Sequence, residues 1–442
     1  MGNNTNIRQN TNINTRELAL EMLIEINENG QFSHIVLRSV LDKYQYLSKQ
    51  DRAFMTRLVD GTIEYMLQMD YIIDQFSKTK VRKMKPFIRN LLRMSVYQIK
   101  YMASVPDSAV CNEAVKIAKR HKFAQLSGFV NGVLRNIARN IDTVEFGDLC
   151  TKYSMPQWIV DRFVAAYGGK KAEQILESFQ QESTISIRTN LMKCTPAQLK
   201  HRLEDEGVTV KEVPELDYAF IISDFDYLNG LSAFKDGLFY VQDISSMMVA
   251  QAASPKPGDN VIDVCAAPGG KSTHIAELLN GTGHVQARDI NDYKVDMIEE
   301  NIQRHGLDNM TACVMDATEY DEASKESADI LICDLPCSGL GVLGRKKDIR
   351  YKMSPQSLTE LVDLQRQILD TVHTYVKPGG TLIYSTCTID EDENEKNVQW
   401  FTGRYPEFEL DKSFANGAGM EQMLPGDHGN DGFFIARFIR NS

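Results

Sequence analysis

Two cysteines of this chain follow short apolar segments, the place where a reactive side chain is most useful. Cys337 lies in D-L-P-C-S-G and Cys387 in Y-S-T-C-T-I, and the segments before them, residues 329–333 and 381–384, are typical of buried parallel strands. The carboxyl ends of parallel strands meet at one edge of a sheet, so we predict that the two thiols converge. Thiols at such an edge suit nucleophilic, covalent chemistry.

The competing interpretation is that these cysteines are small buried hydrophobes, the usual role of a free cysteine. Loops that follow strands carry functional residues disproportionately, which favours a site for this pair. Eight cysteines without a C-x-x-C pair argue against a disulfide scaffold and a structural zinc site, so we expect reduced thiols and no metal. The hydrophobic role is predicted for Cys111, Cys150, Cys194, Cys313 and Cys333.

A second candidate site begins where the apolar strand 261–264 runs into a segment of small residues and then into a helix from Ser272. Small residues let the backbone approach a ligand closely, and the helix start offers free N–H groups. The spacing fits neither a Walker loop nor G-x-G-x-x-G. The predicted cofactor-binding segment comprises Cys265, Ala266, Ala267, Pro268, Gly269, Gly270 and Lys271.

Three aspartates end or follow successive predicted strands after this segment. Asp289 is placed to bind ribose hydroxyls, and Asp316 to accept a hydrogen bond from an adenine amino group. Asp334 is the third. Singly, each could be a helix cap or a solvated acid, but together they favour a cofactor that carries a nucleoside.

The elements that must position these residues fall into three predicted domains after a polar arm, residues 1–14. Residues 15–140 have helical patterns throughout, with helix starts at Asn14, Ser48 and Pro86. Residues 150–240 mix helix and strand and predict a small α/β module that serves as a substrate platform. From 241 to 442 strands alternate with helices, which predicts an α/β fold with a doubly wound sheet.

The net charge of −11 is unevenly distributed. Residues 1–150 carry 21 Lys and Arg against 15 Asp and Glu, so the remainder carries −17. The basic excess predicts that the helical domain meets phosphates, although a small surplus is also common on solvated helix faces. The candidate phosphate contacts are Lys78, Lys80, Arg82, Lys83 and Lys85, and then Lys116, Lys119, Arg120, His121 and Lys122.

Composition and hydropathy are those of a globular protein without a membrane span or a signal peptide. We expect a cytoplasmic protein that is a monomer.

The motifs resemble those of the RNA 5-methylcytosine methyltransferases, which are Rossmann-like class I enzymes dependent on S-adenosylmethionine. The resemblance rests on D-V-C-A-A-P-G-G-K at 263–271, D-L-P-C-S-G-L-G at 334–341 and S-T-C-T-I at 385–389. It extends to Y-V-Q-D-I-S-S at 240–246 and D-G-F-F-I-A-R at 431–437. The helical start resembles the antitermination factor NusB, which points to bacterial members that act on small-subunit (16S) ribosomal RNA. Leu335 departs from the proline or small residue of many relatives.

The resemblance implies a role for each site residue. Cys387 would add to carbon 6 of a cytosine, which makes carbon 5 nucleophilic towards the methyl group. Asp334 would hydrogen-bond the ring nitrogen or amino group of the base, and Lys271 would assist electrostatically. Cys337 would be the release cysteine, which acts as the proton on carbon 5 leaves.

Carbon 6 is inaccessible within a duplex, so the target base must be single-stranded, looped or flipped. We hypothesise that the basic loop 344–347 clamps flanking phosphates. Three alternatives remain: the same chemistry on transfer RNA or another ribosomal RNA, a non-catalytic RNA-binding assembly factor, and a nicotinamide-dependent dehydrogenase. The last lacks its fingerprint and leaves both cysteines unexplained.

Overall fold

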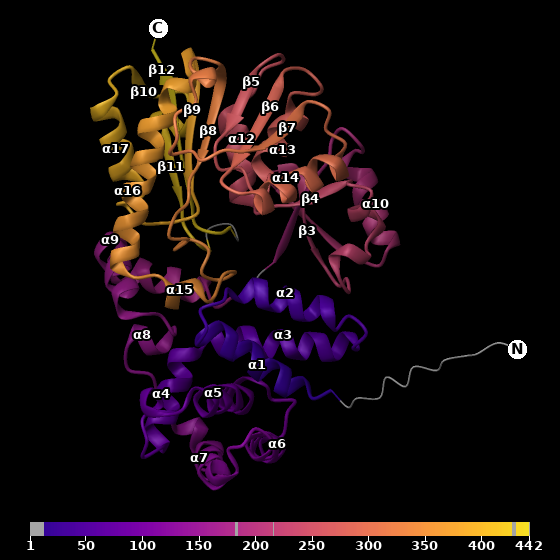
Figure 1. Cartoon of the computed structure of the whole chain (residues 1–442), viewed down its shortest axis with the longest axis vertical. Coiled ribbons are helices and arrows are strands. Elements are labelled where there is room, and N and C mark those ends of the chain that lie inside the picture. The colour runs from indigo at the N-terminus through magenta and orange to yellow at the C-terminus, as the bar shows by residue number, and fades with distance from the viewer. Residues whose placement is uncertain (1–12, 182–183, 215, 427–429, 442) are drawn as a thin grey trace, which may run out of the picture. The chain divides into compact units, whose positions relative to one another are not determined.

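The computed structural model describes residues 13–181, 184–214, 216–426 and 430–441, in two compact units. The helical unit comprises residues up to 162 together with 346–352, drawn mainly in indigo and purple in Figure 1. The α/β unit comprises residues 163–345 and 353–442. The predicted polar arm lies outside the described residues except for its last two positions.

Local capping starts the helices of the helical unit where the sequence predicts. The side chain of Asn14 accepts hydrogen bonds from the backbone of Arg16 and Glu17, Ser48 accepts one from Asp51, and Pro86 is the first residue of its helix. The described helices of this unit include three that the sequence analysis did not anticipate, α2, α4 and α8. The elements are α1 (Thr15–Asn27), α2 (Ser33–Lys43), α3 (Lys49–Glu64), α4 (Met66–Phe76), α5 (Pro86–Tyr101), α6 (Asp107–Arg120), α7 (Ser127–Asn140) and α8 (Leu149–Lys152).

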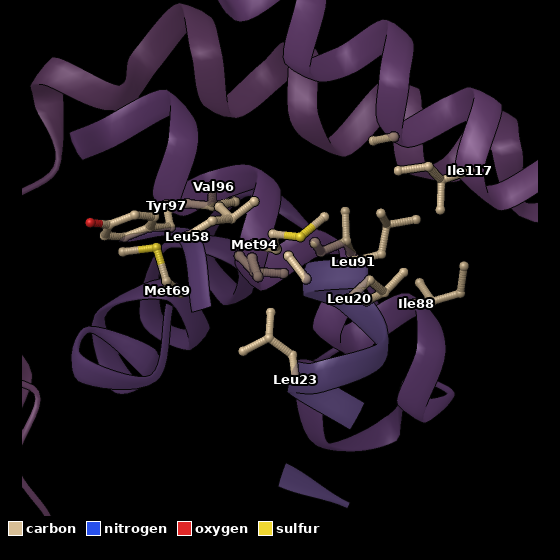
Figure 2. Packing of buried hydrophobic residues seen from close by; sticks show 14 of the residues in the cluster. Leu20, Leu23, Leu58, Met69, Ile88, Leu91, Met94, Val96, Tyr97 and Ile117 are labelled. Carbon is tan, nitrogen blue, oxygen red and sulfur yellow. The ribbon is translucent and has the colours of Figure 1, made fainter. Parts of the chain in front are cut away.

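Helix α5 forms the centre of this unit and packs against α1, α3, α4, α6 and α7. Leu91 and Leu92 of α5 are fully buried, as are Leu23 of α1 and Leu58 of α3. Figure 2 shows the side chains of this core interleaved between the helices. Burial of this apolar surface is the main stabilising contribution, because it removes large aliphatic side chains from water.

Residues 346–352 belong to the helical unit although they follow the Cys337 motif in sequence. Asp348, which is buried, accepts hydrogen bonds from the backbone N–H and hydroxyl of Ser33 at 2.9 and 2.7 Å, at the start of α2. Lys347 pairs with Glu64 at 2.6 Å. The segment ends in α15 (Ile349–Lys352), whose Tyr351 hydroxyl lies 3.1 Å from that of Ser154.

The α/β unit begins within α9 (Gln157–Ser178), which is kinked at Gly168, where φ is +74°. The kink divides this element into two helical segments. A four-stranded antiparallel sheet follows, with strand order β2-β3-β1-β4. Its elements are β1 (Ile185–Thr189), α10 (Pro196–Asp205), β2 (Thr209–Val213), β3 (Leu216–Ser223), α11 (Ser232–Lys235) and β4 (Phe239–Val241).

The second sheet of this unit has the order β10-β12-β9-β8-β5-β6-β7 among the described residues, with β11 paired to β12. The five strands from β9 to β7 are parallel, and β12 runs antiparallel to β9. The fold is therefore a doubly wound mixed sheet. The strands are β5 (Asn260–Asp263), β6 (His284–Asp289), β7 (Met310–Val314), β8 (Ala328–Asp334), β9 (Val376–Thr386), β10 (Phe408–Leu410), β11 (Met420–Met423) and β12 (Phe433–Arg440).

Alternate strand residues enter two separate cores, one on each face of this sheet. Val261 and Ile332 pack with α12 (Ile244–Ala253), α13 (Gly270–Leu278) and α14 (Asp292–His305). Ile262 and Leu331 pack with α16 (Pro355–Val372) and α17 (Glu395–Arg404). Since both faces are covered, the central strands β5 and β8 are mostly apolar, and they end in Asp263 and Asp334.

Gly61 of α3 tests how tightly the helical core is packed. A Cβ at this position would lie 2.0 Å from the ring of Tyr97, which is only 5% exposed. We expect Gly61→Ala to reduce the free energy of unfolding by about 1–3 kcal/mol through overpacking.

Gly132→Ala in α7 is the control, because its Cβ meets open space. The control should raise stability by about 0.5–1 kcal/mol. Urea unfolding followed by circular dichroism distinguishes them, and equal midpoints would contradict the packing argument.

Candidate active site

The polar residues at the carboxyl ends of the parallel strands form the candidate active site. Asp263 ends β5, Asp289 ends β6 and Asp334 ends β8, while Cys387 directly follows β9. Strands β8 and β9 pair in register, with Asp334 opposite Ser385. The loops beyond them also bond to each other, Leu335 N to Ser385 O at 3.1 Å and Gly341 N to Cys387 O at 3.1 Å. The predicted convergence is thereby confirmed.

The thiols of Cys337 and Cys387 lie 3.3 Å apart, sulfur to sulfur, and share a hydrogen bond. This hydrogen bond, together with burial, raises the pKa of Cys337 well above its usual value, and the charge of Glu393 adds to the effect. Cys337 therefore stays protonated, and its S–H can donate a hydrogen bond to the sulfur of Cys387.

Lys271 and Asp334 form an ion pair beside the thiols. The Lys271 ammonium donates to Asp334 Oδ2 at 2.7 Å, and the Ser385 hydroxyl donates to Oδ1 at 2.8 Å. Burial alone would lower the pKa of Lys271, but Asp334, Asp263 and Cys387 outweigh it, so that the pKa is raised. Lys271 thus remains charged and favours negative charge on Cys387.

The cofactor-binding segment turns from β5 into α13 through Gly269, whose φ of +101° favours glycine. The Asp289 carboxylate accepts hydrogen bonds from Ala267 N at 2.9 Å and from Lys294 at 2.9 Å. The structure thus joins Asp289 to the segment. Asp316 follows β7, and its side chain accepts from the backbone and hydroxyl of Thr318 at 2.8 and 2.7 Å.

Several residues that brace this segment were missed by the sequence analysis. Arg188 of β1 donates to Gly270 O at 2.9 Å and forms a buried ion pair with Glu277 of α13, also at 2.9 Å. The Tyr240 hydroxyl and the Asn301 amide donate to Pro268 O at 3.1 and 2.9 Å. The motif at 240–246 carries Tyr240 and was the available signal. Arg188 had none, because its partners are distant in sequence.

The basic loop does not match the hypothesised phosphate clamp. Arg345 lies between Asp243 and Asp431, at 2.8 and 2.5 Å, and Lys347 pairs with Glu64 of the helical unit. These two cations hold loops of the protein, and the phosphate clamp stays a prediction.

The other cysteines differ in burial. Cys111 and Cys333 are buried, in keeping with a hydrophobic role, whereas Cys150, Cys194 and Cys313 are only partly buried. Within the described part of the chain, no helix combines the length and apolar character that crossing a bilayer requires.

Two solved structures share the fold, one over nearly the full length of this chain and the other over about two thirds of it. The structure described as "Crystal Structure of PH0851" has a TM-score of 0.82 at 26% identity, covering 96% of this chain and 99% of the other. The structure of NSun6 from Pyrococcus horikoshii with SFG has a TM-score of 0.59 at 23% identity, covering 65% of this chain and 98% of the other. Fold and site together define a Rossmann-like class I methyltransferase that uses S-adenosylmethionine.

Three family models match consecutive parts of the chain: the NusB family at residues 13–139, the ferredoxin-like domain of RsmF/B-like methyltransferases at 155–225, and 16S rRNA methyltransferase RsmB/F at 250–439. A probable ribosomal RNA small subunit methyltransferase B from Bacillus subtilis is 38% identical over 95% of this chain and 97% of its own length. A Synechocystis relative with the same description is 32% identical, over 96% and 99%. The chain belongs to the RsmB/F family of 16S rRNA methyltransferases.

Asp263, 1% exposed, makes the stability of the site depend on pH. Burial raises the pKa of this carboxyl from 3.8 to about 7, although the Ser272 hydroxyl binds it. A carboxyl with a raised pKa in the folded state takes up a proton on folding, so the free energy of unfolding should fall as pH rises from about 4 to 7. Asn cannot ionise and can still accept from Cys265 N. We expect Asp263→Asn to lose less stability than wild type between pH 5 and 8, in urea titrations. If the variant and the wild type lose the same free energy of unfolding over this range, the raised pKa of Asp263 is contradicted.

Proposed function

We propose that the protein methylates carbon 5 of a cytosine in small-subunit ribosomal RNA through a covalent adduct with Cys387. The observation that carries this proposal is the 3.3 Å approach of two thiols beside a Lys–Asp pair, because no step of cofactor binding or RNA binding needs two thiols. The names of the relatives support small-subunit ribosomal RNA as the substrate.

In the proposed reaction the Cys387 thiolate forms a bond with carbon 6 of the cytosine, and the electron pair of the 5,6 double bond moves to carbon 5. Asp334 hydrogen-bonds the ring nitrogen or amino group, and Lys271 balances the charge in the site. Bound S-adenosylmethionine supplies an electrophilic methyl group, which carbon 5 takes. Once Cys387 is bonded to carbon 6, the Cys337 proton passes to solvent. The Cys337 thiolate then takes the proton from carbon 5, which restores the double bond and expels the Cys387 thiolate.

The residues proposed to hold the cofactor are Cys265 to Lys271 with Asp289, Asp316 and Asp334. Their chemistry fits S-adenosylmethionine, because a small-residue turn lies among carboxylates that can accept from hydroxyl, amino and ammonium groups. We also propose that the chain has the three predicted domains. We propose that the protein works as a monomer in the cytoplasm. The target base is single-stranded, looped or flipped when it reacts.

We further propose that the helical unit binds RNA through a surface built from two basic segments. Phe87, after the segment 78–85, stacks on Phe123 with ring centroids 4.8 Å apart, and its centroid lies 5.1 Å from that of His121. This stack joins the start of α5 to the end of α6, so the two segments are adjacent. Cations beside partly exposed aromatic rings suit single-stranded RNA.

The test of the catalytic proposal supplies methyl-labelled S-adenosylmethionine and unmodified 16S ribosomal RNA, with transfer RNA in parallel. We expect label in 5-methylcytidine from the ribosomal RNA alone. Cys387→Ala should abolish transfer, whereas Cys337→Ala should transfer once and leave RNA covalently bound in denaturing gels. Cys111→Ala is a control for thiol loss in the helical unit.

Label from transfer RNA would overturn the substrate and keep the mechanism. A Cys337→Ala enzyme that turns over normally would refute its release role. If neither RNA is labelled although the protein binds the cofactor, the non-catalytic assembly factor is favoured.

The RNA surface predicts a salt effect. Replacing Arg82, Lys83 and Lys122 with Ala should weaken binding of ribosomal RNA fragments. It should also reduce the slope of log affinity against log salt by about 2, since each phosphate contact contributes about 0.7–0.9. The control replaces Arg38, Lys43 and Lys49, which are also exposed cations of this unit. An unchanged slope in the first variant would count against the surface.

A further inference from the structure

A buried carboxylate lies behind the Cys337 loop and has no role in the proposed reaction so far. Glu393, fully buried, lies between Cys387 and α17 in sequence. Its Oε1 accepts from Ser338 N and from Gln365 Nε2, both at 2.9 Å, and its Oε2 accepts from the Ser338 hydroxyl. A buried carboxylate is costly unless such donors surround it, so the three bonds hold the charge and the loop together.

Gln365 of α16 extends the hold to the other side of Cys337. Its Nε2 also donates to Pro336 O at 2.9 Å, while its Oε1 accepts from the Asn397 amide at 2.8 Å. Pro336 and Ser338 flank Cys337. The side chains of Gln365 and Glu393 therefore fix the backbone on both sides of this cysteine.

The same network reaches the neighbour of the second thiol. The Ser338 hydroxyl lies 2.9 Å from that of Thr388, which follows Cys387. Because the Ser338 hydroxyl donates to Glu393, it accepts from Thr388. Strand β9 and the bond from Gly341 N already hold the chain at Cys387, whereas residues 336–338 lie beyond the end of β8. Loss of Glu393 should therefore displace Cys337 more than Cys387.

We infer that Glu393 is a positioning residue for the release step, which holds Cys337 where the proton on carbon 5 must leave. This inference rests on the covalent mechanism proposed above. Glu393 acts through Ser338 and Gln365 and touches neither the base nor the cofactor. Its negative charge also contributes to the raised pKa of Cys337, after the hydrogen bond to Cys387 and burial.

The test separates methyl transfer from release in single-turnover reactions with 16S ribosomal RNA. For Glu393→Ala we expect the covalent RNA complex, carrying methylated cytosine, to accumulate about tenfold above wild type, the size of effect when a charged hydrogen bond is lost. Methyl transfer and cofactor affinity should each stay within about threefold, because Glu393 touches neither the base nor the cofactor and residues without shared partners are only weakly coupled. If release, methyl transfer and cofactor affinity are all reduced equally, the role of Glu393 is merely structural and the inference is overturned.

The conservative Glu393→Gln should restore release. Its amide oxygen can accept from Ser338 N and Gln365, and its amide group can donate to the Ser338 hydroxyl, which then donates to Thr388. Glu391→Ala is the matched control on the same segment. Glu391 is exposed and pairs with Lys396 at 2.6 Å, so this variant should release RNA like wild type. Accumulation in Glu391→Ala to the same level would overturn the inference.

Two further variants keep the test decisive if Glu393→Ala does not fold. Ser338→Ala removes one bond to Glu393 and keeps the backbone one, and it should also accumulate the complex. Cys337→Ala reports on the mechanism itself. If Cys337→Ala traps RNA and neither Ser338→Ala nor Glu393→Ala does, the inference about Glu393 fails alone. If Cys337→Ala does not trap RNA, the covalent release mechanism has failed first.

Discussion

The parallel, in-register pairing of β8 with β9 is the constraint on which the site depends. It sets Asp334 opposite Ser385, and the loops beyond continue the pairing through Leu335 and Gly341. Two segments about fifty residues apart in sequence thereby place two thiols in contact. Gly341 shows how little room is left, since a Cβ there would lie 2.2 Å from Gly432 O and 2.9 Å from Cys387 O. A side chain at this glycine would force the loops apart and separate the thiols.

Residues of the small antiparallel sheet form hydrogen bonds with the segment that is predicted to bind the cofactor. Arg188 of β1 binds the backbone at Gly270, and Tyr240 of β4 binds that at Pro268. The Arg188–Glu277 pair is buried, so removing either partner would leave an uncompensated charge. The small module predicted as a substrate platform therefore braces the turn between β5 and α13, which is the segment proposed to bind the cofactor.

Much of this fold follows from local sequence signals, and the rest does not. Helix caps at Asn14 and Ser48 and the strand-terminal positions of Asp289 and Cys387 could be predicted, because capping and the geometry of parallel sheets are general rules. Helices α2 and α4 were missed, since neither has a capping side chain. Long-range polar pairs such as Asp348 with Ser33 have no periodic signal. Glu393 was hidden in an acidic run that the sequence alone could not distinguish from solvated surface.

The proposed chemistry demands opposite properties of two adjacent thiols, and the surroundings of the pair differ accordingly. The attacking sulfur needs negative charge at the start, which the ammonium of Lys271 favours near Cys387. The sulfur that assists release keeps its proton during attack, because the hydrogen bond to Cys387 and burial raise the pKa of Cys337, with a smaller contribution from Glu393. One hydrogen bond between the sulfurs couples the two demands: the proton that Cys337 keeps also stabilises charge on Cys387. In the proposed reaction the negative charge on Cys387 is lost when this sulfur bonds to carbon 6. The Cys337 proton can then pass to solvent, which leaves a thiolate that can take the proton from carbon 5.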